Sequence, residues 1–205
     1  MQSTRDILLE ATFKEIYQHG YQGTSLSKIM TSCQLTKGAL YHYFKSKKEI
    51  SLEMIEVSLG GLIENYWEKP IADTQTPFST LLERIENFPS VNIFGEAFLD
   101  VKHGCLLNNL IQEMAPLDDD FSNLLQTIYS RFENAVLLAL EKAQTLGELD
   151  AEVNIKDSAM YITASIEACI TTAKLKNDIN YYYLCVGQLK RYIESLQFEN
   201  KNFSK

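Results

Sequence analysis

The segment Thr24–Phe44, TSLSKIMTSCQLTKGALYHYF, decides the fold of the N-terminal part of the chain. Its apolar residues follow a helical period that breaks at 34–36 and then resumes, which predicts two short helices separated by a tight turn. Ser25 or Ser27 is suited to cap the first helix, and Thr36 to cap a second over 37–43. This pattern is that of a helix-turn-helix.

The second of these helices carries an unusual exposed face for a globular protein. It consists of Thr36, Lys37, Gly38, Tyr41 and His42, which supply hydrogen-bond donors, one positive charge and a close backbone approach. Short polar side chains of this kind suit the major groove of DNA, where base edges are read.

The longer string TSLSKIMTSCQLTKGALYHYFKSKKEI resembles the DNA-binding segment of TetR/AcrR-type bacterial transcriptional regulators, and KGALYHYFKSKKEI is its most specific part. The resemblance extends from about Arg5 to Leu59. The chain departs from the usual pattern at Met30 and Cys33, and at Gln34, where a turn glycine is common. The resemblance implies an all-α fold with an N-terminal three-helix helix-turn-helix domain, a C-terminal helical bundle and a dimeric assembly.

The expected contacts with double-stranded operator DNA are polar or small residues of the motif and of the helix after it. They are Thr24, Ser25, Lys28, Thr36, Lys37, Gly38, Ala39, Tyr41, His42, Lys47 and Lys48. Among them, Lys37, Tyr41, Lys47 and Lys48 are expected mostly at phosphates, and Thr36, Ala39 and His42 at bases. For Lys47 and Lys48 the alternative is a pair of solvated surface lysines.

Charge is distributed unevenly along the 205 residues. Residues 1–50 hold seven Lys or Arg and four acids, a balance of +3, so the net charge of −8 leaves −11 on the rest. A basic end on an acidic body fits a protein that meets DNA with one surface only. No secretory signal, membrane span or close cysteine pair is evident, so we expect a cytoplasmic protein without a membrane partner or disulfide framework.

Helical periodicity covers most of the chain, and no convincing strand is found. We expect helices over about 3–19, 46–68, 76–87, 121–146, 155–176 and 179–196, with a linker at 69–77. Residues 1–60 are assigned to the helix-turn-helix domain (motif 25–44) and 61–205 to a ligand-sensing and dimerisation domain. Gly60-Gly61, inside the 46–68 helix, indicates either close packing against a neighbour or a point where the helix bends.

An enzyme is not indicated by the sequence. The three histidines fit no metal-ligand pattern, and there is no phosphate-binding glycine loop or nucleophile motif. Asp118–Asp120 is better explained as the acidic start of a helix than as a metal site. We therefore expect no cofactor, metal or catalytic residue.

The resemblance implies a pocket for an unknown small-molecule effector within the bundle. Its candidate lining residues are mostly aromatic: Trp67, Phe78, Phe88, Phe98, Cys105, Phe132 and Tyr161. Aromatic stripes at helical spacing also describe an ordinary core. Acidic surroundings favour a cationic or neutral ligand.

Cys105 follows Gly104 at an expected helix N-terminus, where the dipole lowers the pKa of a thiol. It is a candidate redox or electrophile sensor, and the alternative is a buried apolar cysteine.

Together these features predict a ligand- or redox-responsive repressor that binds a palindromic operator as a dimer and is released by a small molecule or by thiol modification. The resemblance places the dimer interface on the helices 155–176 and 179–196, with 121–146 as the second choice. The alternative is a helical ligand-binding or interaction module that no longer binds specific DNA, for which the acidic net charge is the main argument.

Overall fold

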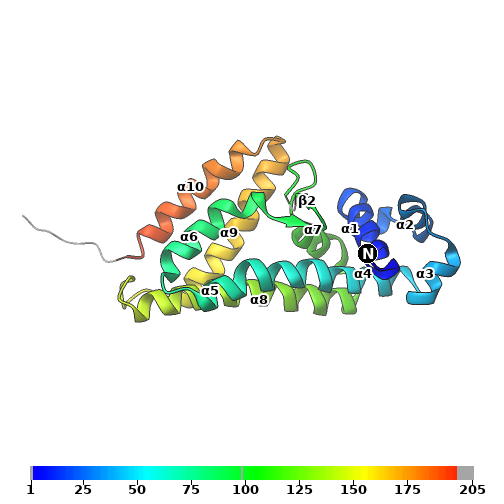
Figure 1. Cartoon of the computed structure of the whole chain (residues 1–205). Helices are drawn as coiled ribbons and strands as arrows, with labels where there is room; N and C mark the ends of the chain where they lie inside the picture. Colours follow the sequence, from blue (N-terminus) through cyan, green and yellow to red (C-terminus); the bar gives the residue numbers. More distant parts are fainter. Residues whose placement is uncertain (1, 98, 198–205) are drawn as a thin grey trace, which may run out of the picture.

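The computed structural model describes residues 2–97 and 99–197 and shows an elongated, almost wholly helical molecule (Figure 1). The helices α1, α2 and α3 gather at one end, and α9 and α10 lie in the body away from them. The predicted all-α fold, with a helix-turn-helix part and a C-terminal helical part, is confirmed.

Local capping signals explain the three N-terminal helices α1 (Thr4–Gly23), α2 (Leu26–Cys33) and α3 (Lys37–Tyr43). Ser3 and Asp6 form a reciprocal capping box on α1, and the Thr36 hydroxyl accepts from the Ala39 N–H at 3.3 Å. Gln34 ends α2 with φ 57°, in the left-handed region that a turn glycine would adopt more easily. The predicted helix-turn-helix is therefore formed, with Gln34 holding the unfavourable turn position.

The first helix was expected to end at Gly20, and Gly20 does interrupt it, with a non-helical backbone at φ 73°. A short helical turn follows this kink and ends at Gly23. A side chain at Gly20 would also crowd Glu113, whose Oε2 atom lies 2.9 Å from the position of an added Cβ. Only glycine satisfies both conditions at this position.

The helix that leaves the DNA-binding end is longer than predicted. After α4 (Lys47–Ile55) the chain winds through two π-helical segments, Glu56–Gly60 and Ile63–Glu68, and continues into α5 (Lys69–Asp73). The linker expected from residue 69 is therefore wrong as far as Asp73. Pro70 lies in the first turn of α5, where a proline is tolerated because the N–H it lacks has no partner within the helix.

The body adds four longer helices around these segments: α6 (Pro77–Asn87), α8 (Asp119–Thr145), α9 (Ile155–Lys176) and α10 (Asn180–Glu194). A 3₁₀ turn, Phe88–Ser90, leads to a minimal antiparallel hairpin of β1 (Asn92–Ile93) and β2 (Glu96–Ala97), where no strand was expected. Helix α7 (Leu106–Met114) contacts α1 and α8. It thus connects the DNA-binding end to the body.

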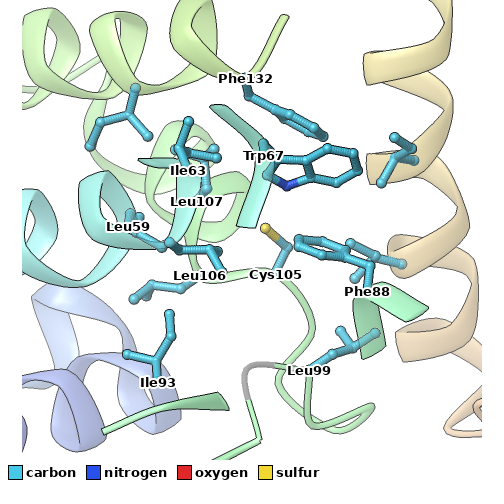
Figure 2. Packing of buried hydrophobic residues seen from close by; sticks show 14 of the residues in the cluster. Leu59, Ile63, Trp67, Phe88, Ile93, Leu99, Cys105, Leu106, Leu107 and Phe132 are labelled. Atoms are coloured by element: carbon cyan, nitrogen blue, oxygen red, sulfur yellow. The ribbon is translucent and has the colours of Figure 1, made fainter. Parts of the chain in front are cut away.

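One continuous core runs through the molecule, and Trp67 is fully buried within it (Figure 2). The indole packs against the rings of Phe132 and Phe88, with ring centroids 4.7 and 5.5 Å away. Gly60 lies against α8, since Arg131 donates to its carbonyl at 3.3 Å and an added Cβ would lie 3.3 Å from Arg131 Nη1. This contact supports close packing as the reason for a glycine at position 60. In the described residues, no helix is both long and apolar enough to cross a membrane.

Candidate nucleic-acid interface and effector cavity

Helix α3 turns its apolar side chains inward and its polar side chains outward. Leu40 and, just past the helix, Phe44 are completely buried, which fixes the helix against α1 and the neighbouring core. Lys37, Tyr41 and His42 are exposed on the opposite side. Within the described part of the chain, no hydrogen bond or ion pair engages the Lys37 ammonium, which leaves it available to an external anion.

The remaining residues that were predicted to contact DNA differ in how far they are exposed to solvent. Ser25, Lys28, Thr36 and Gly38 are exposed, and Ala39 is half-buried. Thr24, by contrast, is only 3% exposed, and its hydroxyl donates to the Gly20 carbonyl at 2.8 Å. Its side chain stabilises the α1–α2 connection and does not lie on the outer face.

Lys47 and Lys48 are both engaged within the chain. Lys47 Nζ donates to the carbonyls of Tyr21 and Thr24 at 2.9 and 3.0 Å, and partial burial lowers its pKa. Lys48 forms ion pairs with Asp118 and Asp120 at 2.8 and 2.6 Å. Neither lysine is a simple solvated side chain.

The acidic start of α8 is therefore a partner of the DNA-binding end. Asp118 caps α8 by accepting from the backbone of Asp120 and Phe121, and the Lys48 ammonium lowers the pKa of Asp118. Among the described residues, no group of three or more His, Cys, Asp or Glu side chains is arranged to hold a metal ion.

Glu113 provides a second connection that the sequence did not suggest. Its carboxylate on α7 accepts the backbone N–H groups of Tyr21 and Gln22 at 2.9 and 2.7 Å. These groups lie just after the kink at Gly20. Two charged contacts, Glu113 to α1 and Lys48 to α8, thus join the helix-turn-helix to the body.

In the described part of the chain, most of the predicted pocket aromatics pack into the core, and Tyr161 lies apart from them. Trp67, Phe88 and Phe132 pack ring against ring, and Phe78 is also buried in the core. Tyr161 lies on α9, is 53% exposed and contacts Tyr192. Phe98 lies outside the described residues.

A cavity of about 840 Å³ instead lies between α7, α8 and α9. Its lining is mixed, with Ile111 and Leu125 among the apolar residues and Asn108, Gln126 and Tyr129 among the polar ones. The volume and the few convergent polar groups are typical of a small-molecule site. A second cavity, of about 620 Å³, lies across α7 beside α1 and shares Asn108, Gln112 and Thr171 with the first.

Cys105 is the N-cap residue of α7, as expected, but its pKa moves in the opposite direction. The side chain is 4% exposed and lies beside Trp67 and Phe88 (Figure 2), and burial raises the thiol pKa well above its ordinary value. The neighbouring carboxylate of Glu167 raises it further; the thiol donates to Glu167 Oε1 at 3.4 Å. The expected lowering by the helix N-terminus is outweighed by desolvation.

Glu167 is itself unusual, being a buried acid in the middle of α9. It is 8% exposed and lines the larger cavity, and burial raises its pKa to about 7. Its Oε2 atom has no hydrogen-bond partner in the described structure. In the sequence Glu167 lies among small residues of α9, and no local pattern indicates that this acid is buried.

Residues 8–54 match the family profile described as bacterial regulatory proteins, tetR family, and residues 82–186 match the tetracyclin repressor-like C-terminal domain. The chain therefore belongs to the TetR family of bacterial transcriptional regulators. The predicted resemblance is confirmed. Members of the family are typically repressors that bind operator DNA as dimers and carry a ligand-binding C-terminal domain.

Two curated relatives are each 28% identical to the chain. An uncharacterised HTH-type transcriptional regulator from Lactococcus lactis aligns over 88% of both chains, and the transcriptional regulator AcuR from Cereibacter sphaeroides over 82% of this chain and 75% of its own. Both are named as regulators.

Solved structures support the fold. A regulatory protein TetR from Rhodobacter sphaeroides has a TM-score of 0.79 at 24% identity, covering 91% of this chain and 96% of its own. Reduced NemR from E. coli has a TM-score of 0.80 at 18% identity, covering 97% and 100%.

Proposed function

We propose that the protein is a dimeric repressor that binds a palindromic operator through α2 and α3 in the cytoplasm. The observation that carries this proposal is the outer face of α3, where Lys37, Tyr41 and His42 are exposed while Leu40 anchors the helix from below. Ser25, Lys28, Thr36, Gly38 and Ala39 extend the same interface. We assign the contacts with DNA bases to Thr36, Ala39 and His42.

A single short recognition helix covers too few base pairs for useful specificity. Two copies related by a two-fold axis read half-sites about one helical turn apart, roughly 34–36 Å. Exposed apolar side chains on α9 and α10 support these helices as the dimer interface: Met160, Tyr161, Leu175 and Leu184 are 57%, 53%, 81% and 65% exposed. Such a surface is unfavourable in a monomer.

The effector site we propose is the cavity between α7, α8 and α9. Helix α7 forms one wall of this cavity, and its Glu113 binds the α1 backbone. A ligand that displaces α7 would therefore alter the position of the helix-turn-helix. Shifting the population from 1:99 to 99:1 requires about 5.5 kcal/mol of differential affinity between the two conformations.

Lys47 and Lys48 contribute to this coupling in the proposal, because their contacts within the chain position the start of α4. The positive charge of Lys47 still attracts the DNA backbone at long range, whereas the charge of Lys48 is balanced by Asp118 and Asp120. Direct phosphate contact by either lysine would first require the loss of its contact within the chain.

Release by thiol modification has weaker support than release by a ligand. The raised pKa of Cys105 keeps the sulfur protonated, and the protonated thiol reacts slowly. In this proposal an oxidant reaches Cys105 only after the cavity region opens. Losing the response to an oxidant in Cys105→Ser would support a sensor, and an unchanged response would remove it.

The alternative function is a ligand-binding module without specific DNA binding. It is favoured by the net charge of −8 and by the internal engagement of Lys47 and Lys48. Fluorescence anisotropy with DNA from upstream of the gene, across a salt series, distinguishes the two. Saturable binding well above a scrambled control, with a steep negative log–log salt slope, supports the repressor; binding no better than the control to any genomic fragment supports the module.

A further inference from the structure

The buried carboxylate of Glu167 gives the larger cavity a specific chemistry. Glu167 lies in the middle of α9, on a stretch of the helix where Ile166 and Cys169 are part of the hydrophobic core. One of its oxygens accepts from the Cys105 thiol, and the other, Oε2, has no partner in the described structure. A buried carboxylate with an unsatisfied oxygen is costly unless another group completes it.

Among residues 2–97 and 99–197, no Lys, Arg or His side chain forms an ion pair with this carboxylate. None of the residues that line the cavity is Lys, Arg or His. The nearest basic side chain of α9 with a defined partner, Lys174, donates to Asn109 and lines the other cavity. Above the raised pKa of Glu167, where the side chain is a carboxylate, a positive charge to complete it would come from outside the described part of the chain.

The rest of the lining suits the body of an organic cation. Ile111, Ala115 and Leu125 offer apolar surface, and the half-buried Tyr129 presents an aromatic ring near the Glu167 carboxylate. Aromatic rings attract cations through their negative faces. An anionic ligand would meet an acid in a desolvated site with no compensating base, and a neutral ligand would leave the charge uncompensated.

We propose that the cavity between α7, α8 and α9 binds a small organic cation, with its protonated nitrogen on Glu167 Oε2 and its apolar part against Ile111 and Leu125. The inference rests on the proposed function, because it assigns a chemical class to the effector of that site. It also connects the bound cation to α7, because the Cys105 thiol at the start of this helix donates to the same carboxylate.

The test uses three probes of similar shape and different charge: tryptamine, tryptophol and indole-3-propionate. Isothermal titration calorimetry on the full chain at pH 8 measures each affinity. Tryptamine is expected to bind about 10- to 100-fold more tightly than tryptophol, from one added charge-assisted hydrogen bond, and the propionate most weakly. Equal affinities, a preference for the propionate, or no binding of any probe at millimolar concentration would overturn the assignment.

Substitutions show which residue is responsible for the preference for tryptamine. Glu167→Gln keeps the shape and should abolish the preference for tryptamine, whereas Glu141→Gln, on the exposed side of α8, should leave it unchanged. Ala115→Phe should fill the cavity and weaken all three probes. A preference retained in Glu167→Gln would contradict the role of this residue.

Operator binding is measured on the same protein samples without any probe. Discrimination among the probes without specific DNA binding would refute the repressor and leave the cation site standing. Specific DNA binding without discrimination would refute only the cation site.

Discussion

Replacing Glu113 with Ala should weaken the attachment of the helix-turn-helix to the body. The carboxylate accepts two backbone N–H groups, those of Tyr21 at 2.9 Å and Gln22 at 2.7 Å. A hydrogen bond to a charged group contributes about 1.5–3 kcal/mol, but Gln22 is exposed and water would replace its partner. The expected loss of unfolding free energy is therefore about 1–3 kcal/mol.

Denaturant unfolding measures this loss, and hydrogen exchange localises it to the amides of Tyr21 and Gln22. Both amides should exchange faster in Glu113→Ala, whereas the exposed Glu141→Ala should change stability by less than about 0.5 kcal/mol. Unchanged exchange at both amides, together with unchanged stability, would refute the attachment.

Three further changes have defined outcomes. His42→Ala should relax base preference more than it weakens overall binding, measured by anisotropy on an operator and its single-base variants; a uniform loss across sequences would contradict base reading. Burial raises the pKa of Glu167 from 4.5 to about 7, so the folded state binds the extra proton between these values and loses up to about 3 kcal/mol of stability as pH rises through them. Glu167→Gln should lack this loss, and parallel stability–pH curves for the two proteins would be inconsistent with it. Iodoacetamide should modify Cys105 much more slowly in the native protein than in urea; equal rates, by peptide mass spectrometry, would show that the thiol is not protected.

The helix-turn-helix could be predicted from sequence because its signals are local. Thr36 caps the helix that follows it directly, and Gln34 sits where the turn requires a left-handed residue. The course of the chain at Pro70 was not predictable in this way. Its π turns are held by α8, where Arg131 binds both the Gly60 carbonyl and the carboxylate of Glu68.

The candidate site was predicted less completely, because its decisive partners are far apart in the sequence. Lys48 forms an ion pair with Asp118, which is 70 residues away in the sequence. The Cys105 thiol donates to Glu167, which is 62 residues away. A lowered pKa was expected for Cys105 because only its position at the start of α7 was considered. In the structure burial raises this pKa, and Glu167 on α9 raises it further. Aromatic residues such as Trp67 were candidates for a pocket because periodicity alone does not separate a lining from a core.

Selection from a random double-stranded DNA library by the purified full chain shows whether the protein recognises a specific operator as a dimer. A dimeric repressor should enrich an inverted repeat whose half-sites are about 10 base pairs apart or a multiple of that spacing, and the bound protein should be dimeric. Recovery of no common sequence, or of a single unrepeated half-site, would contradict dimeric operator binding.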